Sequence, residues 1–216
     1  MKNRIHLYLI RHGETYLNRY KRMQGWADSP LTEEGKLVAI ECGNRLSDIQ
    51  FDRVYTSDSG RTVETAELIL QKNSYEIPVI RKTKAFRESF FGSFEGEFSA
   101  VALGKVANDH GYTSFRELLR NRSLEDITNF IKESDPYHHA ESYSELWDRI
   151  EKGLNELIIE NNKNDENVLI VTHGNTIRNI VTKFSEEFNI ELEIKNASIT
   201  ILEYSSDTYK VISFNQ

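Results

Sequence analysis

Short apolar runs alternate with stretches of helical spacing along the first part of the chain. Three apolar runs predict strands, at Ile5–Ile10, Arg53–Thr56 and Ile77–Ile80. Pro78 places the third run at a sheet edge or at a strand start, because proline has no N–H to donate. Between the runs, apolar residues recur every three or four positions. This spacing predicts a helix over about 32–48 with Thr32 as its N-cap, and a second helix capped by Ser57 or Ser59.

The pattern changes after Glu88 and then returns. Residues from about 97 to 140 contain helical pieces without strand alternation, which indicates an insertion folded over a sheet. Later segments predict a helix, a strand, a helix and a hairpin, at Ser142–Glu160, Val168–Thr172, Asn175–Phe184, and Ile199–Tyr204 with Tyr209–Phe214. The alternation predicts an α/β fold, a three-layer α/β/α sandwich with a mostly parallel sheet, a C-terminal hairpin and a helical cap insertion. We expect a single domain over residues 1–216, with the cap at about 97–140.

Composition narrows the functional classes. The chain has 38% apolar residues, 28% charged residues and a net charge of −7, so neither nucleic acid nor a membrane surface is an expected partner. Cys42 is the only cysteine, which excludes an intrachain disulfide and a thiolate zinc cluster. The apolar run near the N-terminus is too short for a signal-peptide core, and no stretch has the length of a membrane span. A reducing, cytoplasmic setting is expected, and the sequence leaves the oligomeric state open.

Two of the predicted strands end in the same dipeptide, His-Gly. The first strand leads into Arg11, His12 and Gly13, and the strand that ends at Thr172 leads into His173 and Gly174. Ligands of open α/β sheets bind at the carboxyl ends of the strands. We therefore expect the two imidazoles to face one site. Histidines and arginines gathered in this way favour transfer of a phosphoryl group through a phosphohistidine.

The charge of a phosphate monoester assigns the roles. The ester is a dianion near neutral pH, so a neutral imidazole is a better nucleophile than a carboxylate, and His12 is the expected nucleophile. Its second ring nitrogen is expected to donate to a backbone carbonyl. Arg11 and Arg61 can present planar forks to the phosphoryl oxygens, His173 a further donor, and Asn18 a neutral contact. No metal and no other cofactor is needed, because these residues neutralise the developing charge.

Six blocks in a fixed order extend this pattern over nearly the whole chain. They are Arg11-His12-Gly13-Glu14-Thr15 with Asn18, the run from Gln24 to Gly35, the run from Tyr55 to Ala66, Glu88 with Gly92, Glu95 and Gly96, the pair Glu141-Ser142, and Val171-Thr172-His173-Gly174. Together they resemble the histidine phosphatase superfamily, which has the phosphoglycerate mutase-like fold. The resemblance implies that Gln24, Gly25 and Gly174 also contribute to phosphate binding.

The leaving alkoxide needs a proton, and a carboxylic acid can supply it. Glu14, Glu95 and Glu97 are candidates by position, but the spacing of the resembled motif favours Glu88. The same residue would then activate water against the phosphohistidine.

Three functions are compatible with the resemblance. Mutases of this type carry Arg-His-Tyr-Gly after the acidic residue and are longer, whereas this chain has Ser89-Phe90-Phe91-Gly92 and a short cap. The favoured function is therefore a metal-independent phosphomonoesterase for a small phosphorylated metabolite. A cofactor-dependent phosphoglycerate mutase and a non-catalytic module that binds phosphorylated ligands remain as alternatives. Both histidines, both arginines and the acid are present, which disfavours the last.

Several of these residues also have purely structural interpretations. His173 could be a satisfied core histidine, Arg61 a surface charge, Ser57 a helix cap, and Gln24 a residue that orders its loop. Three histidines of the cap region are better interpreted as solvated residues than as metal ligands: His110, His138 and His139. Five cap cations could meet a second anionic group, but surface positions are favoured for them: Arg87, Lys105, Arg116, Arg120 and Arg122.

Overall fold

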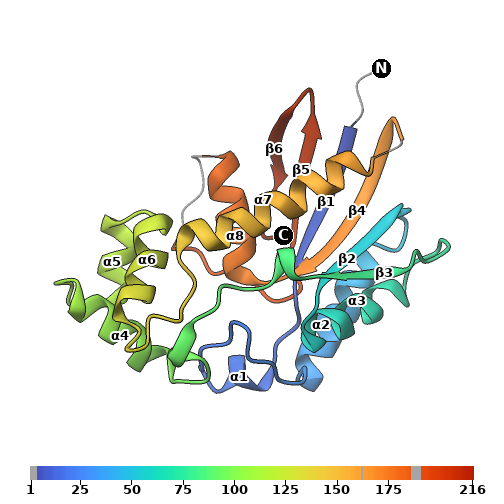
Figure 1. Ribbon diagram of the computed structural model, residues 1–216. Helices are drawn as coiled ribbons and strands as arrows, with labels where there is room; N and C mark the ends of the chain where they lie inside the picture. Colours follow the sequence, from blue (N-terminus) through green and yellow to red (C-terminus); the bar gives the residue numbers. More distant parts are fainter. Residues whose placement is uncertain (1–3, 162, 186–190) are drawn as a thin grey trace.

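A six-stranded sheet forms the centre of the computed structural model, which describes residues 4–161, 163–185 and 191–216 (Figure 1). The strand order is β3-β2-β4-β1-β5-β6. The first four strands in this order run parallel to one another. β5 is antiparallel to both of its neighbours, β1 and β6, and forms the C-terminal hairpin with β6. The bounds are β1 Arg4–Arg11, β2 Arg53–Ser57, β3 Ile80–Thr83, β4 Asp165–Thr172, β5 Ile199–Ser205 and β6 Thr208–Ser213. The mostly parallel sheet with a terminal hairpin confirms the sequence-based prediction.

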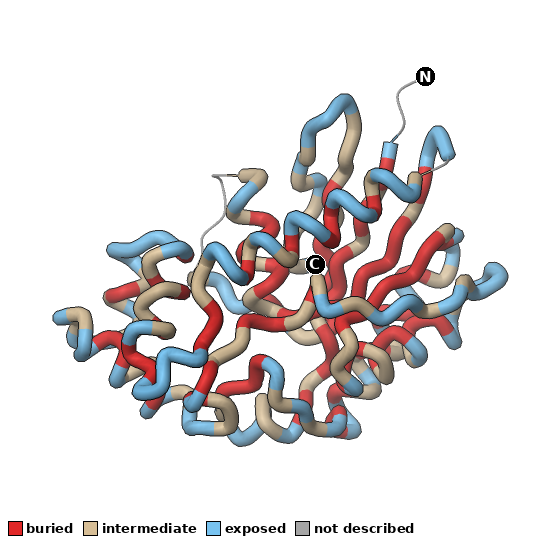
Figure 2. Tube along the Cα trace, viewed as in Figure 1, coloured by how far each residue is buried: buried red, intermediate tan, exposed pale blue. Residues whose placement is uncertain are grey.

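Helices cover both faces of the sheet. Side chains alternate between the faces of a strand, so Leu7 and Leu9 of β1 pack on one side and Ile10 on the other. The first side is covered by α7 (Tyr143–Ile159) and α8 (Gly174–Phe184), and the second by α2 (Glu33–Arg45) and α3 (Gly60–Leu70). Because both faces of the sheet are covered, β2 is buried throughout and the second half of β4 is almost entirely apolar, as is typical of parallel strands between two helix layers. Figure 2 shows these strands as the most buried part of the molecule.

Three further helices form a separate cluster beyond the carboxyl ends of the central strands (Figure 1). These helices, which we call the cap, are α4 (Ser99–Asp109), α5 (Phe115–Asn121) and α6 (Leu124–Ser134). They enclose an apolar core of their own, which includes Val106, Leu118 and Ile127. A short helix, α1 (Tyr16–Arg19), and two 3-10 turns at Lys84–Phe86 and Gly92–Phe94 complete the described elements.

The main corrections to the predicted bounds concern two strands and one helix. The strand predicted at Val168–Thr172 begins earlier, at Asp165. The run Ile77–Ile80 was expected to be a strand, but β3 begins only at Ile80, which pairs with Val54 of β2. Pro78 cannot donate to a sheet ladder, so pairing starts after it. The helix predicted over about 32–48 ends at Arg45, while its N-cap Thr32 is confirmed by a hydrogen bond from the Gly35 N–H to the Thr32 hydroxyl.

Candidate active site

The sheet register brings the two His-Gly segments together. β1 and β4 are parallel neighbours, with Ile10 opposite Val171 and Arg11 opposite Thr172. The next residue of each chain segment is a histidine, so His12 and His173 leave the sheet side by side. Their ring centroids are 5.2 Å apart, with the ring planes at 66°. The structure therefore confirms that the two imidazoles lie next to each other at this edge of the sheet.

His12 is held as a neutral imidazole with one free nitrogen. Its Nδ1 donates to the Gly13 carbonyl oxygen at 2.8 Å, which fixes the tautomer with the lone pair on Nε2. Burial, reinforced by the positive charges of Arg61 and Arg11, lowers the pKa of His12 well below its ordinary value. Within the described part of the chain, no hydrogen bond engages Nε2. An imidazole in this state has the lone pair that a nucleophile needs at neutral pH.

His173 belongs to a buried hydrogen-bonded chain. Arg61 donates from Nη2 to Nδ1 of His173 at 2.9 Å, which leaves the ring proton on Nε2 to bond the Ser57 hydroxyl at 2.7 Å. The Ser57 hydroxyl in turn lies 3.0 Å from that of Thr62. Burial is the main cause that lowers the pKa of His173 well below its usual value, followed by the charge of Arg61. Both ring nitrogens are therefore occupied, and a direct bond from His173 to a phosphoryl oxygen stays a prediction.

The arginines beside His12 retain unsatisfied donors. Arg61 is 1% exposed, and its two terminal nitrogens donate to Ala27 O, Asp28 Oδ1, Gly25 O and His173 Nδ1. Its Nε–H has no partner among the described residues, and the same is true of Nε of Arg11. Buried donors without an acceptor are rare in folded proteins because leaving one unpaired is costly. Two such donors beside a neutral histidine fit an anion better than they fit a closed core.

One carboxylate orders the loop that carries Arg61's acceptors. Glu95 accepts four backbone N–H groups, from Gly25 and Ala27 at 3.0 Å each, Trp26 at 2.9 Å and Phe91 at 3.0 Å. Gly25 is required there, because a Cβ at this position would overlap the carbonyl oxygen of Ser89. Gly25 thus serves the site through Arg61, and its predicted direct contact with phosphate stays a prediction.

Glu88 lies at the N-terminus of α8. Its carboxylate accepts from the backbone N–H groups of Asn175, Thr176 and Ser89 at 3.0, 3.1 and 3.0 Å. The helix N-terminus favours an acidic group at this place. Arg149 fixes the same segment from behind by donating to the Glu88 carbonyl oxygen at 3.0 Å. Glu88 lines the cavity that holds His12, as a proton donor to a leaving group there must.

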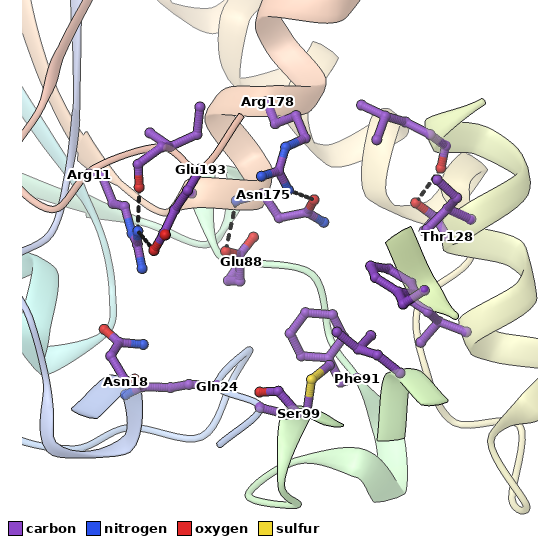
Figure 3. Close-up of a pocket in the computed structure, with 18 of the residues that line it drawn as sticks. Arg11, Asn18, Gln24, Glu88, Phe91, Ser99, Thr128, Asn175, Arg178 and Glu193 are labelled. Atoms are coloured by element: carbon purple, nitrogen blue, oxygen red, sulfur yellow. Dashed lines mark hydrogen bonds and ion pairs between the residues drawn. The ribbon is translucent and has the colours of Figure 1, made fainter. Parts of the chain in front are cut away.

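A cavity of about 360 Å³ lies between the sheet edge and the cap (Figure 3). Six of the predicted site residues line it: Arg11, His12, Asn18, Gln24, Glu88 and Gly174. Arg61, His173 and Gly25 are absent from its lining and support it from behind. The Gln24 side chain is used by its loop, accepting from Thr15 Oγ1 at 2.5 Å and donating to Ser29 Oγ at 3.2 Å.

Six polar lining residues were not predicted from the sequence: Arg22, Ser99, Thr128, Asn175, Arg178 and Glu193. Asn175 and Arg178 follow Gly174 on α8, and the spacing of four from Gly174 to Arg178 on one helix face could have revealed the arginine. Glu193, whose Oε1 lies 3.6 Å from Arg11 Nη1, belongs to an irregular segment that carries no such signal. Arg11 also donates to the carbonyl oxygen of Ile194.

Comparison with known sequences identifies the family. The sequence profile of the histidine phosphatase superfamily (branch 1) matches residues 7–216. The chain belongs to this superfamily. The match confirms the resemblance inferred from the six motifs, and it covers both histidines, both arginines and Glu88.

Members of the superfamily that resemble this chain carry two kinds of name. A broad-specificity phosphatase of Saccharomyces cerevisiae is 30% identical, over 97% of this chain and 84% of its own length. A 2,3-bisphosphoglycerate-dependent phosphoglycerate mutase of Bacteroides fragilis is 27% identical, over 93% of this chain and 87% of its own. A crystal structure described as a phosphoglycerate mutase from Bacillus anthracis is 36% identical, with a TM-score of 0.95, covering 100% of this chain and 94% of that one. Superfamily membership therefore leaves phosphatase and mutase to be separated.

The described residues contain no group of three or more His, Cys, Asp or Glu side chains arranged to hold a metal ion. His110 stacks on Phe130, with ring centroids 3.7 Å apart.

None of the described helices is long and apolar enough to cross a membrane.

Proposed function

We propose that this superfamily member is a metal-independent phosphomonoesterase that acts on a small phosphorylated metabolite through a phosphohistidine at His12. The observation that carries the proposal is the pair of buried, unpartnered Nε–H groups of Arg11 and Arg61 beside the neutral His12. A phosphoryl group placed there would meet Arg11, which lines the cavity with His12, and the charge of Arg61 behind the lining would add to that of Arg11.

The first chemical step forms a bond between His12 Nε2 and phosphorus. The bond from phosphorus to the ester oxygen breaks, its electron pair goes to the leaving oxygen, and Glu88 supplies the proton. In the second step, water loses a proton to Glu88 and attacks phosphorus. The bond from phosphorus to Nε2 then breaks, which releases inorganic phosphate and regenerates the imidazole. This sequence is general acid–base catalysis combined with a covalent intermediate.

The mutase is the second candidate, because relatives with that name are among those most similar to this chain. A bisphosphorylated carboxylate would require cations around the whole cavity. The five cations predicted in or near the cap are not part of the described lining, and each has another partner: Arg87 with Asp58, Lys105 with Asp109, Arg116 and Arg120 with Glu191, and Arg122 with Tyr112. Besides Arg11, the described lining holds Arg22 and Arg178, which donate to the carbonyl oxygens of Gly96 and Leu192. The few cations with free donors in the cavity support the phosphatase. A reducing, cytoplasmic setting is part of the same proposal, in line with the single, unpaired Cys42.

Hydrolysis of p-nitrophenyl phosphate by protein treated with EDTA tests the proposal. We expect turnover to survive chelation, to disappear in His12→Ala, and to persist in His6→Ala, which removes a histidine at the other end of the same strand. Turnover with radiolabelled substrate, quenched in an alkaline denaturant, should trap an adduct at His12 that is stable in base and labile in acid. Loss of activity on chelation, or turnover by His12→Ala, would contradict the mechanism. Conversion of 3-phosphoglycerate in the presence of 2,3-bisphosphoglycerate, faster than its hydrolysis, would establish the mutase instead.

A further inference from the structure

The cavity has two chemically different halves. Figure 3 shows Arg11, Asn18 and Gln24 on one side and Phe91 and Thr128 on the other. The second half is lined mainly by apolar side chains from the cap and its flanking segments: Met23, Phe91, Leu103, Phe115, Leu119, Leu124, Ile127 and Ile131. We propose that this half is a subsite for an apolar alkyl or aryl group, so that the preferred substrates are phosphate monoesters of hydrophobic alcohols or phenols. The inference rests on the proposed function and adds the substrate class to it.

The polar groups of this half are largely used within the protein. The Thr128 hydroxyl donates to the Leu124 carbonyl oxygen at 2.7 Å, one turn earlier in α6. Arg22 donates to Gly96 O at 2.6 Å, and its guanidinium lies 4.1 Å from the centre of the Phe98 ring. A sugar or carboxylate in this half would lose water and find few partners, which disfavours it strongly.

Several apolar side chains of the lining remain partly exposed to solvent, and a ligand in the cavity could cover them. Phe91, Leu103, Phe115 and Leu119 are only partly buried although they pack against the core of the cap. Their surface in the cavity is therefore apolar area in contact with solvent, and removing it from water stabilises a complex in proportion to the area. The cavity volume of about 360 Å³ is within the range of small-molecule sites.

The proposed reaction would also place the organic part of the substrate in the apolar half of the cavity. With phosphorus at His12 and Arg11, the leaving oxygen must reach Glu88. Phe91 follows Glu88 by three residues and lines the apolar half, so the organic part of the ester would continue from the acid toward Phe91 and the cap.

Binding of n-alkylphosphonates, which cannot be hydrolysed, tests the subsite without turnover. We expect the dissociation constant, measured by calorimetry, to fall about three- to fourfold per methylene from ethyl- to hexylphosphonate, as for a fully buried CH₂. For hydrolysis, kcat/KM should rise in the same way along the alkyl phosphates and should exceed that for glycerol 3-phosphate. Dissociation constants that do not fall with chain length would overturn the subsite. Absence of turnover alongside the expected binding series would overturn only the proposed hydrolysis.

Substitutions in the apolar half, compared with a control on the same helix, test whether the dependence on chain length arises there. Leu103→Asn and Leu119→Asn each place an amide in the apolar half, and we expect them to flatten the dependence on chain length. Val101→Asn is the control, because Val101 lies on the same helix as Leu103, is 58% exposed and is not part of the described lining. An unchanged slope in both Leu variants would show that the alkyl chain binds elsewhere.

Discussion

Replacing Glu95 with alanine should disable the site without touching a residue of the proposed chemistry. The four N–H groups that Glu95 accepts lose their acceptor, and three of them belong to the loop whose carbonyl oxygens at Gly25 and Ala27 hold Arg61. A fully buried donor left unpaired costs about 1–3 kcal/mol. Because this loop is partly exposed, water replaces part of the loss, and we expect a decrease of about 2 kcal/mol in unfolding free energy.

The larger effect should be on turnover. A transition-state donor that is no longer held in place costs on the order of a hundredfold in kcat, so kcat/KM for p-nitrophenyl phosphate should fall by about that factor in Glu95→Ala. Urea unfolding followed by circular dichroism measures the stability separately. Glu97→Ala is the control, since Glu97 is exposed and its carboxylate accepts, among the described residues, from the adjacent Phe98 N–H at 2.7 Å. If Glu95→Ala is folded and retains activity within twofold of the unmodified protein, the loop does not position Arg61 as argued.

Three further results are expected. In the unfolded chain, His12 and His173 take up protons below pH about 6.5, whereas burial in the folded protein keeps both neutral. The free energy of unfolding should therefore fall by about 1 kcal/mol per histidine from pH 7 to 5.5. A free energy of urea unfolding that does not change over this range would refute it. Glu193→Gln removes the exposed carboxylate that competes for Arg11, so KM for a phosphomonoester should fall about threefold at low salt, and a higher KM would give Glu193 a supporting role. Ser57→Ala leaves the Nε2–H of His173 without its acceptor, so kcat should drop about tenfold with KM little changed, and Ser57→Thr should restore part of it.

The fold could be predicted from the sequence wherever the local residue pattern matches the burial of the element. Runs of mainly apolar residues identified β1 and most of β4, because a strand covered on both faces carries few polar residues. The β3 bounds were wrong because Pro78 lies at the start of an edge strand, where few contacts decide which residues pair. The polar start of β4, at Asp165–Asn167, was missed for a related reason: these residues pair with β1 although their sequence is typical of a turn.

Residues of the candidate site could be predicted from the sequence only where they belong to recognisable motifs. His12, Arg11 and Glu88 could be assigned because each sits at a fixed place after a strand or in a recognisable run. The partners of His173 could not be foreseen, since its bond to Ser57 joins positions 116 residues apart in the chain. The apolar half of the cavity was also out of reach, because helical spacing shows which cap residues are apolar but not which of them face the site.

The adjacency of β1 and β4 has a consequence for how activity arises during synthesis. The proposed nucleophile is made within the first dozen residues, yet the neighbouring imidazole follows a strand that emerges only after three-quarters of the polypeptide has left the ribosome. A nascent chain therefore carries His12 for most of its elongation without a phosphate cradle around it. Pulse-labelled translation intermediates that stop before the fourth strand should be inert toward phosphate esters, even when their helices have already formed.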